Sequence, residues 1–387
     1  MSEFLSYGKQ WLDEDDKRAV LEVLESDFLT QGPSVAEFEK AICNYTGAKF
    51  CVAVANGTAA LHLAVAALDI EKGSEGITSP ITFVASANCL VYNNLKPIFA
   101  DIDEKTYNID PAEIEKKITN KTKVIIPVHF AGQPADMGEI AKIAKEHHLF
   151  VIEDAAHAIG SKYKDGSKVG SCKYSDLTIF SFHPVKTITT GEGGVITTND
   201  EKLYQKLLLL RSHGITKNPS ELSQNPGPWY YEMQTLGYNY RLSDIQAALG
   251  ISQIEKLDKF SRRRREIVNK YNKAFAEFKN VVIPFEADGL DSTFHLYVLK
   301  IDFEKIGKSR EIVMNELKQR NIGTQVHYIP VHLQPYYQKH FGYKEDDFAK
   351  AEAYYKKCLS LPLFPKMTDE DINFVIKCFK GVCDEKL

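Results

Sequence analysis

The sequence predicts an α/β fold: a large first domain with a mainly parallel sheet, followed by a smaller α+β domain. Up to Asn199, short apolar segments alternate with helical ones, which is typical of a parallel sheet with helices on both faces. From about Val281 the pattern changes, and "TFHLYVLKID" and "GTQVHYIP" flank a helical segment at 309–320. We therefore expect a large domain at residues 1–258 and a small domain at 259–387.

Seven strands are expected in the large domain. Each is a short apolar run bounded by polar or turn-forming residues. In chain order they are "KFCVAV", "EGITSP", "KPIFADID", "TKVIIPVHF", "LFVIEDAAH", "DLTIFSFH" and "GGVITTN". The helix "MGEIAKIAKEHH" separates the fourth strand from the fifth.

Two helical regions carry further expectations. In "LDEDDKRAVLEVLES", Asp13 is placed to cap the helix, and the buried stripe is expected at Val20, Leu21, Val23 and Leu24. The long helical stretch after residue 243 is expected to break near residue 260. Its basic run, residues 262–265, is expected on a solvated helix face.

Composition excludes several classes of protein. The 387 residues carry a net charge of -4, which gives no reason to expect a nucleic-acid partner. Seven scattered cysteines without Cys-x-x-Cys spacing indicate reduced thiols rather than disulfides or a zinc site. The first residues lack the pattern of a signal peptide, and no apolar run is long enough to span a bilayer. We expect a cytoplasmic protein with no membrane partner.

Polar residues cluster after several of the predicted strands, where ligands bind in open parallel sheets. In "NGTAALHL", Gly57 permits a tight turn and Thr58 begins a helix, whose free amides favour a phosphate. The alternative is a capped helix without a ligand. In "VIEDAAHA", Asp154 follows Glu153, and a buried carboxylate needs a cationic partner such as a protonated ring nitrogen. The alternative is an aspartate that caps a helix, with His157 close behind.

Two further clusters complete the set. In "FSFHPVKTITTGEGGV", Lys186 follows a strand whose Ser181 could reach a phosphate, and burial there would lower the lysine pKa and leave a nucleophilic amine. The alternative is a surface lysine on a loop. In "GYNYRLSD", Asn239 and Arg241 lie in a polar turn before a helix, and the alternative is a loop that ends in an N-cap at Ser243. Together, a phosphate cradle, a ring-nitrogen partner and a Schiff-base lysine are what pyridoxal 5'-phosphate (PLP) needs.

The chain resembles the sugar aminotransferases of the DegT/DnrJ/EryC1/StrS family almost from end to end. The resemblance is carried by "LTQGPSVAEFEKAI", "NGTAALHLA", "PITFVASAN", "EDAAHAIGS", "FSFHPVKTITTGEGG", "LRSHGI", "LGYNYRLSDIQAALG" and "QVHYIPVH". It implies a fold-type-I, aspartate-aminotransferase-like architecture. The stretches "SFHPVKTITT" and "GYNYRLSDIQAALGISQIEKLD" are most similar to the members that act in pseudaminic acid biosynthesis.

The resemblance also implies roles for single residues. Lys186 would bind the cofactor covalently and move protons, while Asp154 would keep the pyridine nitrogen protonated. Phe83 would stack on the ring and His157 would lie near its 3-hydroxyl. The phosphate would be bound by Gly57, Thr58 and Ser181, and by Asn239 of the other subunit of a homodimer with shared sites.

The expected reaction is a ping-pong transamination through pyridoxamine phosphate. The family implies L-glutamate as the donor and a nucleotide-activated 4-keto-6-deoxy sugar, UDP-4-keto-6-deoxy-N-acetyl-β-L-altrosamine, as the acceptor; other UDP or dTDP keto-sugars, aminated at C4 or C3, stay open. No arginine follows Arg320, so the guanidinium that grips an amino acid carboxylate in many aminotransferases of this fold is missing from that region. His327 and Tyr328 are candidates for sugar binding instead, and Arg241 is the candidate for the donor carboxylate.

A rival interpretation comes from another class of enzyme. Asp101-x-Asp103 matches the metal-binding pair of many nucleotide-sugar glycosyltransferases, although two acidic residues after a strand more often cap a turn. No metal is expected on the aminotransferase interpretation. The loop at 215–236, rich in Pro, Asn and aromatic residues, is a candidate cover for the sugar, and His183 has no assigned role.

Overall fold

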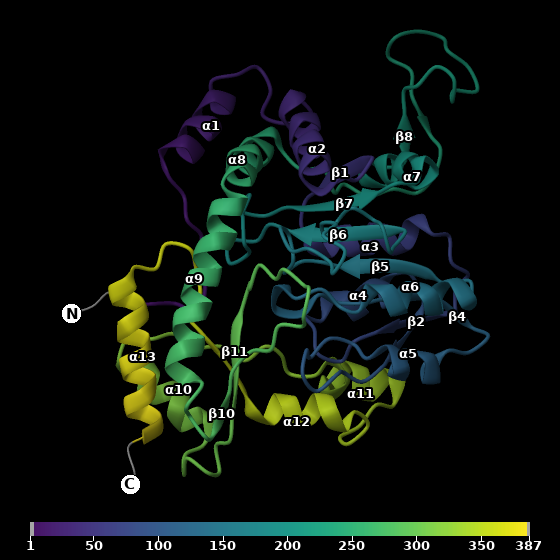
Figure 1. The fold of residues 1–387 in the computed structure, drawn as a ribbon. Helices are drawn as coiled ribbons and strands as arrows, with labels where there is room; N and C mark the ends of the chain where they lie inside the picture. Colours follow the sequence, from purple (N-terminus) through teal and green to yellow (C-terminus); the bar gives the residue numbers. More distant parts are fainter. Residues whose placement is uncertain (1–3, 385–387) are drawn as a thin grey trace.

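A seven-stranded sheet forms the centre of the computed structural model, which describes residues 4–384 (Figure 1). The strand order is β1-β7-β6-β5-β4-β2-β3, and only β7 runs antiparallel to its neighbours. All seven predicted strands are present: β1 (Phe50–Val54), β2 (Glu75–Thr78), β3 (Lys96–Phe99), β4 (Thr122–Ile126), β5 (Phe150–Asp154), β6 (Leu177–Ser181) and β7 (Gly194–Thr198).

Helices cover both faces of the sheet, as the strand pattern predicts. Side chains alternate along each strand, so Val52 faces one buried cluster and Cys51 the other. One cluster contains residues of α3 (Gly57–Ala67), α4 (Ala85–Tyr92) and α7 (Glu201–Arg211). The opposite cluster contains residues of α2 (Pro33–Thr46), α5 (Pro111–Lys117), α6 (Met137–Glu146) and α8 (Asp244–Glu255).

The helix α9 (Leu257–Phe275) corrects two expectations. The break between α8 and α9 lies at Lys256, not near residue 260. Arg264, in the basic run, is only 1% exposed, and its Nη1 donates to the carbonyl oxygens of His295 at 3.2 Å and Leu363 at 3.0 Å. The run was expected on a solvated face, but α9 is covered on this side by the C-terminal part of the chain, whose carbonyls take the place of water.

The first helix, α1 (Glu14–Leu24), has the predicted N-cap at Asp13 but not the predicted apolar stripe. Val23 is buried, whereas Leu21 and Leu24 are 55% and 51% exposed. The helix is attached to α8 through buried Asp16, which accepts hydrogen bonds from Ser252 and Gln253. A polar junction therefore sets the orientation of α1 and leaves apolar side chains on its outer surface.

The C-terminal part contains a second, antiparallel sheet of β10 (Val281–Val282), β11 (Tyr297–Ile301) and β12 (Cys358–Leu361). It forms a separate buried cluster with α9, α10 (Arg310–Gln319) and α13 (Asp369–Asp384). α10 has the predicted limits, with Ser309 as N-cap and Arg320 as C-cap.

The remaining elements are short. They are the 3-10 turns at Phe130–Gly132 and Val331–Leu333, α11 (Pro335–Phe341), α12 (Ala349–Lys357), β8 (Ile215–Thr216) and β9 (Glu232–Met233). β8 and β9 form a hairpin whose loop extends away from the body of the chain (Figure 1). Within residues 4–384, no helix combines the length and apolarity that crossing a membrane requires.

Candidate active site

The carboxyl ends of β1, β5 and β6 bring the predicted residues to one edge of the sheet. β5 ends at Asp154 and β6 at Ser181. After β1, Asn56 caps α3 by accepting a hydrogen bond from the Ala59 amide at 2.8 Å. The candidate cofactor residues therefore lie at or just after the carboxyl ends of these strands, where ligands bind in open parallel sheets.

Gly57 and Ser181 are in close contact. A β-carbon at position 57 would lie 2.7 Å from Ser181 Cβ and 2.9 Å from Ser181 Oγ, so a larger residue would displace the serine. Thr58 lies in the first turn of α3, where the helix dipole is positive. A turn without a side chain, two hydroxyls and a helix N-terminus fit a phosphate group.

Asp154 is buried, and its carboxylate accepts hydrogen bonds from two uncharged groups. Ser86 donates to Oδ2 at 2.6 Å, and the Ala156 amide donates to Oδ1 at 3.2 Å. In the part of the chain that the structure describes, Asp154 forms no ion pair within 4 Å with a lysine, arginine or histidine. A buried carboxylate without a bonded cation fits a protonated pyridine nitrogen.

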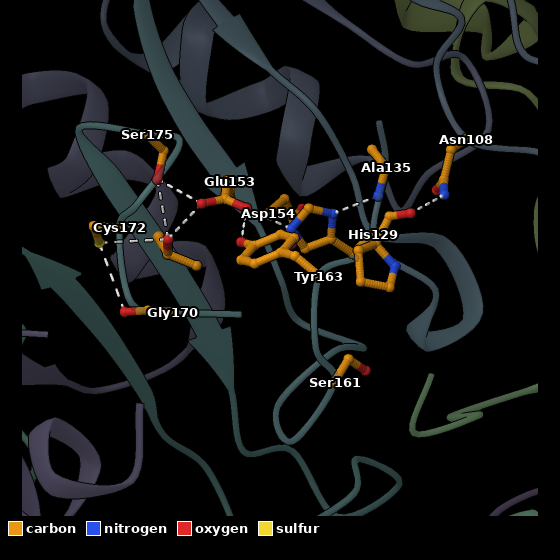
Figure 2. A network of polar contacts seen from close by, with 12 residues as sticks. Asn108, His129, Ala135, Glu153, Asp154, Ser161, Tyr163, Gly170, Cys172 and Ser175 are labelled. Atoms are coloured by element: carbon orange, nitrogen blue, oxygen red, sulfur yellow. Dashed lines mark hydrogen bonds and ion pairs between the residues drawn. The ribbon is translucent and has the colours of Figure 1, made fainter. Parts of the chain in front are cut away.

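Glu153, the preceding residue, has its own partners on the other side of β5 (Figure 2). It is fully buried and contacts His129 Nε2 at 2.7 Å, while Tyr163 and Ser175 donate to its oxygens. Burial raises the pKa of Glu153, but its bonds with His129, Ser175 and Tyr163 outweigh that effect and hold the pKa below its usual value. Of the two adjacent carboxylates, only Asp154 remains for a ligand.

Lys186 follows β6 in a tight turn in which its amide donates to the His183 carbonyl at 2.9 Å. The side chain is partly buried. Burial lowers the pKa of Lys186 to about 8, although the charge of Asp154 acts in the opposite direction. The amine is therefore more readily deprotonated than a surface lysine, as the sequence analysis expects for a nucleophile.

His157 is buried beside Lys186 and has one free ring nitrogen. Its Nε2 lies 3.1 Å from the Tyr328 hydroxyl, and its Nδ1 has no hydrogen-bond partner. Burial raises the pKa of Tyr328, so this hydroxyl keeps its proton and is able to donate to Nε2 when the ring is protonated at Nδ1. Burial, with the charges of Lys186 and His327, lowers the pKa of His157 well below its usual value. A neutral ring that accepts at Nε2 carries its proton at Nδ1, which fits a cofactor oxygen.

Phe83 lies in the turn between β2 and α4 and is 58% exposed. Its ring centroid lies 6.4 Å from that of Tyr328. Ser86, three residues later, bonds the Asp154 carboxylate. One turn therefore holds both an accessible aromatic face and a hydroxyl bound to the carboxylate, which fits a planar ring stacked on Phe83.

The segment with Asn239 and Arg241 runs beside the end of β1, where the Ala55 amide donates to the Tyr240 carbonyl at 2.8 Å. The Asn239 side chain is exposed, and Arg241 Nη1 donates to Ser212 Oγ at 3.0 Å. The expected N-cap at Ser243 is present as a capping box with Gln246. An exposed Asn239 is accessible to a second subunit.

Of the other candidates, His327 is buried with its Nδ1 2.8 Å from Ser360 Oγ, and burial, then the charge of Lys186, lowers its pKa to about 3. His183 is exposed.

Asp101 caps α12 by accepting from the amides of residues 350 and 351 at 3.0 Å, and Asp103 accepts from the Thr106 amide at 2.7 Å. Asp103 therefore has the turn-capping role that was the alternative to metal binding, whereas Asp101 binds the first turn of a helix far along the chain.

Sequence reasoning missed three residues of the site. Ser86 lies in the same motif as Phe83, "ITFVAS". Its position three residues after Phe83 could have indicated that it belongs to the same site. His295, whose ring centroid is 4.4 Å from that of His157, and Tyr7, whose ring centroid is 5.2 Å from that of His327, had no local signal because tertiary folding alone brings them there.

This combination of fold and site defines a PLP-dependent aminotransferase of fold type I. Residues 10–380 match the model of the DegT/DnrJ/EryC1/StrS aminotransferase family, and the chain belongs to that family. It is 46% identical over 380 residues to the spore coat polysaccharide biosynthesis protein SpsC of Bacillus subtilis, covering 98% of this chain and 97% of SpsC.

Solved structures agree with this assignment. The chain superimposes with a TM-score of 0.92 on PseC of Helicobacter pylori, an aminotransferase involved in the biosynthesis of pseudaminic acid (33% identity, 99% of this chain and 100% of PseC). The TM-score is also 0.92 for the pyridoxamine form of the sugar aminotransferase Spr1654 of Streptococcus pneumoniae (31% identity, 99% and 100% coverage). The protein is a PLP-dependent sugar aminotransferase and not a glycosyltransferase.

Proposed function

We propose that this enzyme transfers an amino group from L-glutamate to a nucleotide-activated 4-keto-6-deoxy sugar, UDP-4-keto-6-deoxy-N-acetyl-β-L-altrosamine. The likeness to PseC supports a substrate of this kind. One observation supports the proposal most directly. Lys186, whose pKa is lowered to about 8, and buried Asp154 lie at or just after the carboxyl ends of neighbouring strands. When bound, PLP accepts the amino group from the donor and passes it to the keto-sugar.

The residues of this chain have separate tasks in the proposal. Asp154 would hold a proton on the ring nitrogen, and His157 would donate from Nδ1 to the ring oxygen. Gly57, Thr58 and Ser181 would bind the phosphate, and Phe83 would cover the ring face. Lys186 would hold the cofactor and move the proton at the substrate carbon, which a lysine of near-neutral pKa performs well.

The acceptor pocket of the proposal lies on the side of the C-terminal part. His327 and Tyr328 are consecutive residues there and carry no permanent charge, because burial keeps the histidine neutral and the phenol protonated. Neutral donors and aromatic faces suit a sugar better than a carboxylate. Arg241 is the proposed partner of the donor carboxylate.

We also propose that the chain divides into two domains, at residues 1–258 and 259–387, with the antiparallel sheet in the second.

A homodimer with shared sites is part of the proposal, as is a cytoplasmic location. Apolar side chains are exposed on the surface of α1, at Leu21 and Leu24, and in the loop between β8 and β9, at Trp229 and Tyr231. Such side chains are typical of interfaces. In Figure 1 the β8–β9 loop projects away from the edge where β5 and β6 end, so it would cover the sugar in the partner's site rather than in its own.

The direct test replaces Lys186. Lys186→Ala is expected to abolish the yellow absorbance of the lysine-bound cofactor and turnover with every keto-sugar. Lys339→Ala, on a helix far along the chain, is the control and should change neither. A Lys186→Ala enzyme that still aminates sugars at the wild-type rate would contradict the assignment.

A further inference from the structure

One histidine and three tyrosines form a cluster behind the segment that carries Asn239. His62, on α3, has its ring centroid 4.7 Å from that of Tyr238 and 5.9 Å from that of Tyr240. Tyr92, at the end of α4, lies against the same histidine at 5.4 Å. The rings of Tyr238 and Tyr240 are stacked, with centroids 5.1 Å apart. The cluster therefore connects α3 with the residues on either side of Asn239.

The backbone around Asn239 is held from two sides. On one side, the Ala55 amide donates to the Tyr240 carbonyl at 2.8 Å. On the other, the His213 amide donates to the Tyr238 carbonyl at 2.9 Å. Successive side chains of an extended segment point to opposite sides, so the two tyrosines face α3 while Asn239 between them is exposed. The position of the Asn239 side chain thus depends on where the two tyrosines lie.

One hydrogen bond orients the histidine within the cluster. The Tyr240 hydroxyl lies 3.2 Å from His62 Nδ1. Burial raises the pKa of Tyr240, as do the neighbouring phenols of Tyr238 and Tyr92, and burial lowers the pKa of His62. The phenol therefore keeps its proton, and it is able to donate to Nδ1 when the neutral ring is protonated at Nε2. His62 Nε2 is buried and has no hydrogen-bond partner among residues 4–384.

We propose that His62 is a positioning residue, which through Tyr240 holds Asn239 where its amide reaches the cofactor phosphate of the other subunit. This inference rests on the proposed function, in which Asn239 has that task. A side-chain amide bonds a phosphate oxygen well only when its direction is set. His62 lies two turns of α3 or less from Gly57 and Thr58, at the N-terminus of the same helix. One helix would thus support the phosphate of its own site directly and that of the neighbouring site through His62.

The test measures cofactor affinity rather than turnover. Tyr240→Phe removes the hydroxyl and keeps the stacked ring, and His62→Phe removes the acceptor. Each variant is expected to weaken PLP binding by the cofactor-free enzyme about twofold to tenfold, as for the loss of one neutral hydrogen bond. Capture of pyridoxal, which lacks the phosphate, should be unchanged. His147→Phe, at the exposed end of α6, is the matched control and should alter neither affinity.

A double-mutant cycle separates positioning from a general loss of structure. Asn239→Ala removes the group on which His62 acts, so His62→Phe should cause no further loss of PLP affinity in that background. A loss of the same size with and without Asn239 would overturn the role of His62. Unchanged PLP affinity in both single variants, or weaker capture of pyridoxal, would overturn it as well.

The proposed function can fail separately from this inference. A wild-type enzyme that aminates no nucleotide keto-sugar would overturn the proposed substrate, whereas the PLP affinities, and with them the role of His62, would stand. An Asn239→Ala enzyme that binds PLP as tightly as wild type would overturn the phosphate role of Asn239 and this inference with it, but not the choice of sugar.

Discussion

The hydroxyl of Ser86 lies 2.6 Å from Oδ2 of Asp154, and both side chains are buried. Thr82 Oγ1 lies 2.7 Å from the same serine oxygen. The carboxylate that we assign to the cofactor ring is thus held by a chain of hydroxyls. Because the acceptor of this hydrogen bond is ionised, we expect its loss to cost more free energy than the loss of a bond between neutral groups.

The first prediction concerns this bond. Ser86→Ala should weaken PLP binding about tenfold to a hundredfold, since hydrogen bonds to charged groups contribute about 1.5–3 kcal/mol. Thr82→Val keeps the Ser86 donor and should have a smaller effect. Fluorescence titration of the cofactor-free enzyme measures both constants. Equal affinities for wild type and Ser86→Ala would show that the serine does not position Asp154.

A second prediction follows from the pKa of Lys186. The neutral amine captures the cofactor, so the rate of capture by cofactor-free enzyme should rise as the pH increases through about 8, well below the range of an ordinary lysine near 10.4. Stopped-flow absorbance between pH 6.5 and 10 measures this profile, with Lys186→Ala as the blank. A midpoint near 10 would contradict the desolvation argument.

The third prediction concerns the stability of the network behind the site. Glu153→Gln leaves His129 without its buried carboxylate, and the free energy of unfolding should fall by about 3 kcal/mol at neutral pH. Because the folded-state pKa of Glu153 is lowered, its contribution is present above the unfolded pKa of about 4.3 and is lost as the pH falls through the folded value. Denaturant titrations at several pH values should show the difference shrinking in acid; a constant difference would count against an ionised Glu153 carboxylate in the folded protein.

A fourth prediction tests the shared site. Asn239→Ala and Lys186→Ala homodimers should each have little activity. If Asn239 acts on the partner's phosphate, a hybrid dimer of the two variants contains one complete site and should recover up to half the activity per dimer. Co-expression with two affinity tags isolates this hybrid. A hybrid as inactive as its parents would place Asn239 in its own subunit's site.

The fold could largely be predicted from the sequence, because alternation of apolar strands and helices is a local property. The site could be predicted in part, since Gly57, Asp154 and Lys186 each follow a strand. What could not be predicted depends on contacts between distant segments. Nothing local shows that Arg264 is covered by carbonyl groups of the C-terminal part, or that α1 is attached by Asp16 rather than by its leucines.

The same limit explains the residues that were missed. The adjacent acids Glu153 and Asp154 look alike in the sequence, and only the fold shows that His129 forms a hydrogen bond with the first. Tyr7 reaches the site because the C-terminal region binds its backbone. The positions of the candidate cofactor residues could therefore be predicted from motifs, whereas the contacts around His327 needed the structure.

The central claim, amination of a nucleotide keto-sugar, is tested most directly with isotopically labelled glutamate. The holoenzyme is incubated with glutamate labelled at its amino nitrogen and a panel of UDP and dTDP keto-sugars, and the products are analysed by mass spectrometry. We predict label in the amino group of a 4-amino-4,6-dideoxy UDP-sugar. Label that appears only in amino acids formed from added α-keto acids, with every keto-sugar unchanged, would contradict the account.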